Sequence, residues 1–145
     1  MERVLIVRHV LSMLALVGCV GAAPTTMPFS TIARGDRSQI EEPRQVVVRG
    51  AAQWSALWKE HGGAGSPPAV DFSGSMVVAV FLGTRPTAGY SVEIARIDRQ
   101  GDGLVVTYRE HRPPPDAMVA QVLTAPFDIV RTVRSDDPVT FEPAR

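Results

Sequence analysis

The stretch that decides the fold reads MVVAVFLGTRPTAGYSVEIARID and runs from Met76 to Asp98. Its first seven residues, 76–82, are all apolar, and a glycine lies close to each end of the run. A short run of this kind predicts a strand that is buried on both faces. From residue 90 apolar and polar residues alternate, which predicts a strand with one buried face. Ile97 is out of phase with that alternation, so we expect a β-bulge near Ala95 and Arg96.

The loop between these two strands, GTRPTAGY, is the first candidate for a functional surface. Its proline fixes φ, and its two glycines can adopt the positive φ that a sharp turn requires. Binding residues are often found on loops that a rigid scaffold positions, and a purely structural turn is the alternative. The predicted partner-binding residues are Gly83, Thr84, Arg85, Pro86, Thr87, Ala88, Gly89 and Tyr90. Within this set Arg85 and Thr87 are expected at an exposed tip.

The composition fits one folded domain and argues against a nucleic-acid partner. The chain has 145 residues, 45% of them hydrophobic, and a formal net charge of +0. That length fits a single domain, and a neutral chain has no basic excess with which to neutralise phosphates. The single cysteine, Cys19, excludes an internal disulfide.

The first residues have the pattern of a signal peptide, which we expect to span residues 1–18. An apolar segment precedes Leu16-Val17-Gly18-Cys19, which resembles the bacterial lipobox. The resemblance implies lipid attachment at Cys19 and a location in the bacterial cell envelope. Anchoring in the outer membrane, facing the periplasm or the surface, is the expectation. An ordinary secretory signal is the alternative. Residues 19–40, rich in small and polar residues, are predicted to form a flexible tether, and residues 41–145 the folded domain.

The rest of the chain predicts short strands and one helix. Trp54, Leu57, Trp58 and His61 are spaced to share one face of a helix over residues 51–61. Further strands are expected at 44–49, 104–110, 127–133 and 139–142, with a possible edge strand at 119–124. Because most connections are short, the predicted fold class is α+β and mainly β. The expected form is an antiparallel sheet, or a small sandwich or barrel, of five to seven strands with one N-terminal amphipathic helix.

Catalytic and metal-binding motifs are not found in the sequence. It contains no nucleophile elbow and no P-loop, and no His or Cys pair with metal-ligand spacing surrounds His61 or His111. We therefore expect no enzyme activity, no cofactor and no metal site.

Residues 77–94, VVAVFLGTRPTAGYSVEI, resemble the signature of the PrcB C-terminal domain family. The Trp54-x-x-x-Trp58 pair, the Pro-rich segment that begins at Arg112 and the sequence Thr124–Phe127 are similar to the same family. The resemblance implies an envelope lipoprotein that acts as an accessory subunit of a secreted subtilisin-type protease complex. Residues 85–90 are also similar to the loop with which chagasin-type inhibitors enter cysteine peptidases, although Arg85 and Ala88 depart from that pattern.

Three functions follow from these observations as hypotheses. The first is a non-catalytic module that binds or stabilises a protein partner, for example a secreted protease, through residues 83–90. The second is a protease inhibitor that uses the same loop. The third is a structural envelope domain without a protease partner, in which the loop serves the fold alone.

Overall fold

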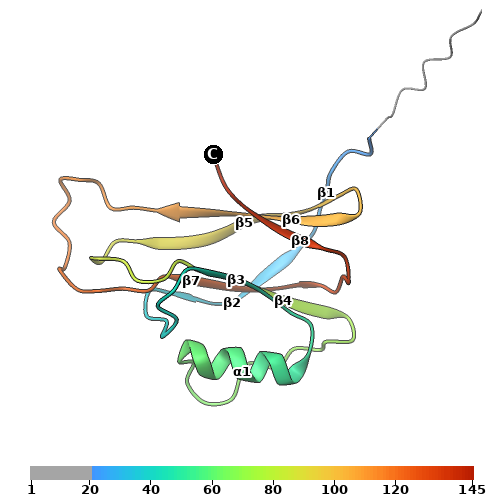
Figure 1. The fold of residues 1–145 in the computed structure, drawn as a ribbon, viewed down its shortest axis with the longest axis horizontal. Helices are drawn as coiled ribbons and strands as arrows, with labels where there is room; N and C mark the ends of the chain where they lie inside the picture. Colours follow the sequence, from blue (N-terminus) through green and yellow to red (C-terminus); the bar gives the residue numbers. More distant parts are fainter. Residues whose placement is uncertain (1–20) are drawn as a thin grey trace, which may run out of the picture.

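Residues 21–145 form a two-sheet sandwich with one helix against its outer side (Figure 1). A computed structural model describes residues 21–145. The predicted signal peptide 1–18 and the lipidation residue Cys19 lie outside the described residues. No helix within 21–145 is long and apolar enough to cross a membrane.

The two sheets have four strands each and are largely antiparallel. One sheet has the order β1-β5-β6-β8 and the other β2-β7-β4-β3. The exception is β8, which pairs with β6 in parallel. The mainly β, α+β prediction is confirmed, with eight described strands in place of five to seven. The bounds are β1 Thr25–Thr26, β2 Phe29–Gly35, β3 Arg44–Val48, α1 Ala51–His61, β4 Ser75–Phe81, β5 Ser91–Gln100, β6 Gly103–His111, β7 Phe127–Val133 and β8 Val139–Pro143.

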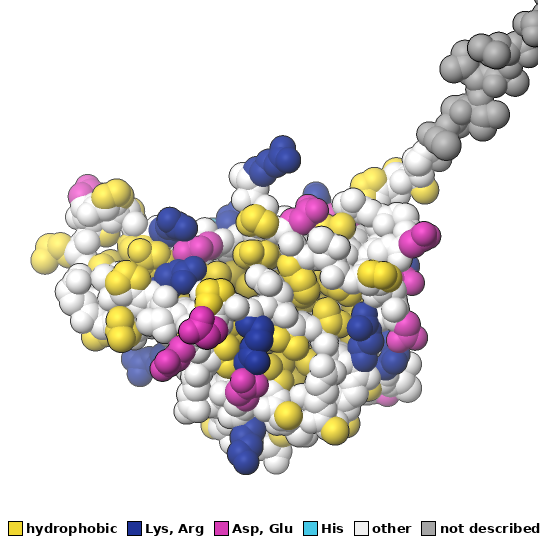
Figure 2. All heavy atoms as spheres, in the orientation of Figure 1, with side chains coloured by type: hydrophobic (Ala, Val, Ile, Leu, Met, Phe, Trp, Pro, Cys, Tyr) yellow, Lys and Arg dark blue, Asp and Glu magenta, His cyan; other side chains and the backbone are white. Residues whose placement is uncertain are grey.

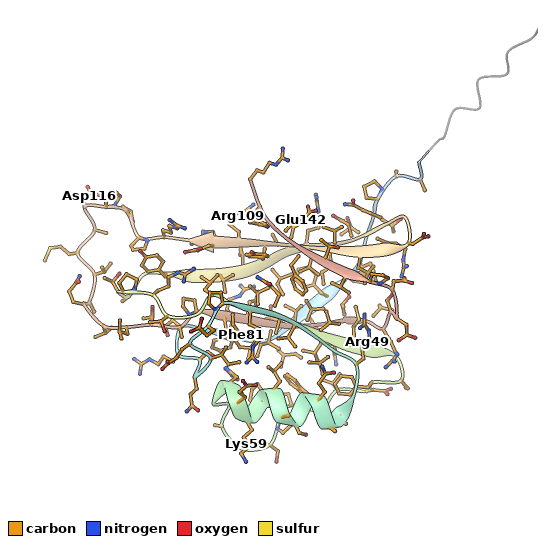
Figure 3. All side chains as sticks on the ribbon, in the orientation of Figure 1. Arg49, Lys59, Phe81, Arg109, Asp116 and Glu142 are labelled. Carbon is orange, nitrogen blue, oxygen red and sulfur yellow. The ribbon has the colours of Figure 1, made fainter. Side chains whose placement is uncertain are left out.

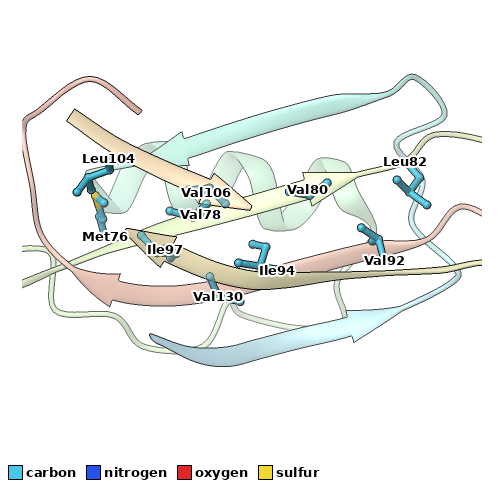
Figure 4. Packing of buried hydrophobic residues seen from close by; sticks show 10 residues of the cluster. All are labelled: Met76, Val78, Val80, Leu82, Val92, Ile94, Ile97, Leu104, Val106 and Val130. Carbon is cyan, nitrogen blue, oxygen red and sulfur yellow. The ribbon is translucent and has the colours of Figure 1, made fainter. Parts of the chain in front are cut away.

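Strand β4 separates the two hydrophobic cores. Met76, Val78 and Val80 point between the sheets, where they meet apolar side chains of β5, β6 and β7 (Figure 4). Val77, Ala79 and Phe81 point the other way, into a second cluster beneath the helix. Because a strand sends alternate side chains to opposite faces, only an unbroken apolar run can supply both cores. The predicted burial of this strand on both faces is confirmed.

Helix α1 covers the outer face of the β2-β7-β4-β3 sheet. The side chains that it places there come from the face predicted by their helical spacing. Trp54, Leu57 and His61 are buried, whereas Trp58 is only half-buried at the margin of the contact. Gly62 ends the helix with φ of 87°, a left-handed conformation that glycine adopts without steric cost.

The predicted flexible tether over residues 19–40 is wrong for residues 25–35. Thr25 and Thr26 pair with β5 as β1, and β2 is an edge strand that pairs with β7. Met27 and Phe29 pack against the core between the sheets, and Ile32 packs against the helix-side core. Three well-spaced apolar side chains are enough to hold this segment, although its average composition is typical of a linker.

Other local predictions had mixed outcomes. The β5–β6 register shifts between Ile94 and Arg96, which confirms the bulge. The possible edge strand at 119–124 does not form, and its only ladder contact is a single bridge between Arg85 and Thr124. Val133 is exposed at the end of β7.

Burial of His61 predicts a pH-dependent stability. Its ring centroid lies 4.3 Å from that of Phe127, and desolvation lowers the pKa of His61 below its ordinary value. The folded state therefore binds fewer protons than the unfolded state, so stability falls as pH drops below about 6.5. We expect a lower melting temperature at pH 5 than at pH 7 in thermal unfolding.

Replacing this ring isolates the effect. The change His61→Phe should remove most of the dependence between pH 7 and 5, whereas His111→Gln, at an exposed site, should leave it in place. The carboxylates with lowered pKa values, such as Glu93 and Glu110, lose their contribution only at lower pH. An unchanged dependence in His61→Phe would show that another group is responsible.

Candidate binding surface

The loop 83–90 is held to the fold by backbone hydrogen bonds along most of its length. The Thr84 N–H donates to the Glu41 carbonyl at 2.9 Å. Arg85 and Thr124 exchange two backbone hydrogen bonds, and the Ala88 N–H donates to the Ala120 carbonyl. These bonds dock the loop against residues 120–124, so it does not project freely into solvent.

Arg85 is a structural residue, which corrects the prediction that it lies at an exposed tip. Its Nε and Nη2 donate to the two carboxylate oxygens of Glu110 at 3.1 and 3.3 Å, and its Nη1 donates to the Leu82 carbonyl at 2.8 Å. Burial raises the pKa of Glu110, but the hydrogen bonds and charges of Arg85 and Arg112 outweigh it, so the pKa lies below its ordinary value. These bonds fix the loop and engage the guanidinium within the fold.

Thr87 is also engaged within the fold. Its hydroxyl donates to the Ala88 carbonyl at 2.9 Å, and its own carbonyl accepts a bond from the Thr124 hydroxyl at 2.9 Å. Tyr90, the last of the predicted binding residues, is half-buried. Among the predicted loop residues Thr84, Pro86 and Gly89 are exposed.

The two loop glycines have the predicted positive φ, 74° at Gly83 and 93° at Gly89. At Gly83 a Cβ would also lie 2.7 Å from the Glu41 carbonyl oxygen, closer than real Cβ atoms approach. Glycine is therefore required there both by conformation and by the close passage of the chain at residues 41–43.

Exposed apolar side chains gather on the neighbouring segment 112–126, which we call the strap. The strap forms the end of the sandwich at the left of Figure 1 and carries Asp116 at its tip (Figure 3). Met118 is fully exposed, Leu123 is 75% exposed and Val122 is 54% exposed. Yellow side chains lie at the same end in the space-filling view, interspersed with white ones (Figure 2). Large apolar side chains clustered in solvent are typical of a protein-binding surface.

A groove of about 600 Å³ lies between the strap and two other segments. Ala120 and residues 122–125 of the strap form one border of the groove. Asp36–Ser38 and Glu41 form another, and Thr84 and Ala88 complete it. The predicted loop thus contributes part of this surface, while the strap contributes its exposed apolar side chains. Within residues 21–145 no group of three or more His, Cys, Asp or Glu side chains is placed to hold a metal ion.

Comparison with known proteins identifies the central part of the chain. Residues 76–132 match the family model described as PrcB C-terminal. This segment is similar to the PrcB C-terminal family. The match runs from β4 through loop 83–90 and the strap into β7. It confirms the expected family and gives no support to the fainter similarity to chagasin-type inhibitors. No curated protein and no solved structure matches the chain at a significant level.

The strap is not among the residues that the sequence predicted as the partner-binding loop. Residues 118–123 read MVAQVL, an apolar stretch that borders a proline-rich turn. The same letters describe a buried edge strand equally well, because exposure depends on whether another segment covers them. Their position after three consecutive prolines was the available signal, since prolines end pairing and let the chain leave the sheet.

The Arg85–Glu110 pair predicts that the loop stabilises the fold. Arg85→Ala removes hydrogen bonds to a carboxylate and to a carbonyl, and we expect it to lower the free energy of unfolding by about 2 kcal/mol in urea denaturation. Arg112 provides the matched control, because it contacts the same Glu110 at 3.3 Å from an exposed position. Arg112→Ala should cost no more than about 0.5 kcal/mol. Equal losses in the two variants would contradict a structural role for Arg85.

Proposed function

We propose that this protein is a non-catalytic protein-binding module of the bacterial cell envelope, an accessory subunit of a secreted protease complex. Similarity to the PrcB C-terminal family supports the association with a protease complex. The observation that carries the proposal is the set of exposed apolar side chains on the strap, next to an open groove. The partner surface is therefore the strap together with the groove-facing part of loop 83–90.

The alternative in which loop 83–90 blocks a protease active site has weaker support. An inhibitory loop of that kind presents side chains to the protease, whereas Arg85 and Thr87 make their hydrogen bonds within the fold. Assays with purified serine and cysteine peptidases would separate the two functions. An accessory subunit leaves peptide hydrolysis intact, and an inhibitor abolishes it.

The test of the proposed function is capture of a protein partner by tagged full chain from envelope extract. We expect an enriched extracytoplasmic protease with the wild-type chain and at least a tenfold loss with Met118→Ser, Leu123→Ser. Both changed side chains are exposed, so stability should change by no more than about 0.5 kcal/mol each. Val133→Ser, at an exposed apolar site on β7, is the control and should keep full capture. Equal capture by all three chains would refute the strap as the partner surface.

We further propose that the module is anchored to the membrane by lipid attached to Cys19, as the lipobox-like sequence Leu16–Cys19 indicates. A single acyl chain binds a bilayer only marginally, so two or three chains are expected. Cys19→Ser should abolish metabolic labelling with a radioactive fatty acid and leave the precursor unprocessed. Labelling that persists in this variant would exclude Cys19 as the attachment residue.

A further inference from the structure

Residues 121–123 of the strap have backbone hydrogen-bonding groups without protein partners. None of their N–H or C=O groups is hydrogen-bonded within the described chain 21–145. All three residues are exposed, so water satisfies these groups. On either side of this gap the chain is paired, at Ala120 with Ala88 and at Thr124 with Arg85.

The pairing of the next two residues shows which way the free groups point. Thr124 directs its N–H and C=O toward Arg85, and Ala125 directs its own toward Asp36 and Ser38 on the opposite side. Because successive residues of an extended chain alternate in this way, Leu123 directs its N–H and C=O to the same side as Ala125. The segment 36–38 covers only Ala125, so the edge beside Leu123 stays open.

The groove beside this edge suits a polypeptide backbone. Three of its lining residues, Ala88, Ala120 and Ala125, have only a methyl side chain, which leaves room for the close approach that strand pairing requires. Val122 and Leu123 provide exposed apolar surface for alternate side chains of a guest strand. An extended peptide is the ligand that uses free backbone donors and acceptors together with side-chain pockets.

The charge of the residues that border the groove indicates which side chain the bound peptide carries. Asp36 and Glu41 both border it, and both are accessible. Arg37 is the only basic residue on the border, and its side chain is 95% exposed and reaches Asp36 only at 4.0 Å. The border therefore carries a formal charge of −1 from two carboxylates and one guanidinium. A cationic side chain complements this charge.

We infer that residues 121–123 bind an extended segment of the partner by β-strand addition, and that this segment carries a Lys or Arg beside alternating apolar residues. The inference rests on the proposed binding function and names the form in which the partner is bound. The cation lies toward Asp36 and Glu41, and the apolar side chains lie against Val122 and Leu123.

The test starts from a random dodecapeptide phage library panned on the full chain in detergent. Enriched peptides should carry a Lys or Arg next to alternating apolar residues. A synthetic enriched peptide is then N-methylated at alternate amides in two complementary sets. Because a β-strand pairs through only one edge, one set should weaken binding at least tenfold and the other less than threefold. No enrichment, or equal effects of the two sets, would overturn the inference.

A variant with fewer negative charges at the groove tests whether the bound peptide carries a cationic side chain. Asp36→Asn, Glu41→Gln should weaken the same peptide at least fivefold and leave the melting temperature unchanged, because the two side chains make no hydrogen bond in the described fold. Asp102→Asn, Glu142→Gln, at exposed positions away from the groove, is the matched control. Equal binding by both double variants would overturn the assigned cation. Loss of partner capture in Met118→Ser, Leu123→Ser without strand-like peptide binding would retain the proposed function and reject this inference alone.

Discussion

Trp54→Ala should lower the free energy of unfolding by about 4 kcal/mol, the largest effect of any single change considered for this fold. Trp54 is 3% exposed and belongs to the helix-side core. Its Nε1 donates to the Pro68 carbonyl at 2.9 Å, so the ring also holds the loop that leads into β4. A loss of this size is a large share of the total stability of a small domain.

The neighbouring tryptophan provides the comparison. The ring centroids of Trp54 and Trp58 are 5.5 Å apart, but Trp58 is half-buried at the edge of the same cluster. Trp58→Ala should therefore cost about 2 kcal/mol, less than a fully buried ring would. Urea denaturation followed by far-UV circular dichroism measures both. Equal losses would show that α1 packs on its sheet differently from the arrangement described.

Asp128→Ala should cost about 3 kcal/mol, the second largest effect. Asp128 is fully buried on β7, where its Oδ2 accepts a bond from the Ile94 N–H of the opposite sheet at 2.7 Å. The same oxygen accepts a bond from Arg34 Nη2 at 2.8 Å, which raises the pKa of Arg34 above its ordinary value. The change leaves a buried N–H without an acceptor and a guanidinium without its counter-charge.

The isosteric variant separates these two losses. Asp128→Asn keeps an oxygen for the Ile94 N–H but removes the charge that Arg34 faces, so it should cost less than Asp128→Ala. Denaturant unfolding of the two variants under the same conditions gives the difference. If Asp128→Asn proved as damaging as Asp128→Ala, the ion pair, and not the bond between the sheets, would carry the stabilisation.

The sequence predicts the fold best where the composition of a segment is compatible with only one type of structure. Residues 76–82 are apolar at every position, and only a strand between two cores can bury them. The face of α1 was likewise readable from the spacing of its aromatic residues. In contrast, β2 has polar residues between its apolar ones, and its pairing with β7 joins residues about 100 positions apart. No local pattern reports such a contact, because the stabilisation comes from the distant partner.

The candidate site was predictable in place but not in detail. Gly83 and Gly89 correctly indicated a constrained loop, because a position with positive φ strongly favours glycine. The role of Arg85 could not be read, since its partner Glu110 lies 25 residues later on another strand. An exposed arginine and a paired one have the same letter in a sequence. Because Arg85 is paired with Glu110 inside the fold, we expect the partner to contact the strap and not Arg85.

The short strand β1 determines how this domain would be presented on a surface. Five residues, 20–24, separate Cys19 from Thr25, and the six Cα–Cα steps between them span at most about 22 Å. A lipid at Cys19 would therefore connect to the domain through a short tether, which would limit how far the domain can move away from the membrane. The chain enters beside β1 at one end of the long axis, and the strap lies at the other end (Figure 1). With the tether at the β1 end, the strap would lie at the end of the domain farthest from the bilayer. A neighbouring protein could reach it there.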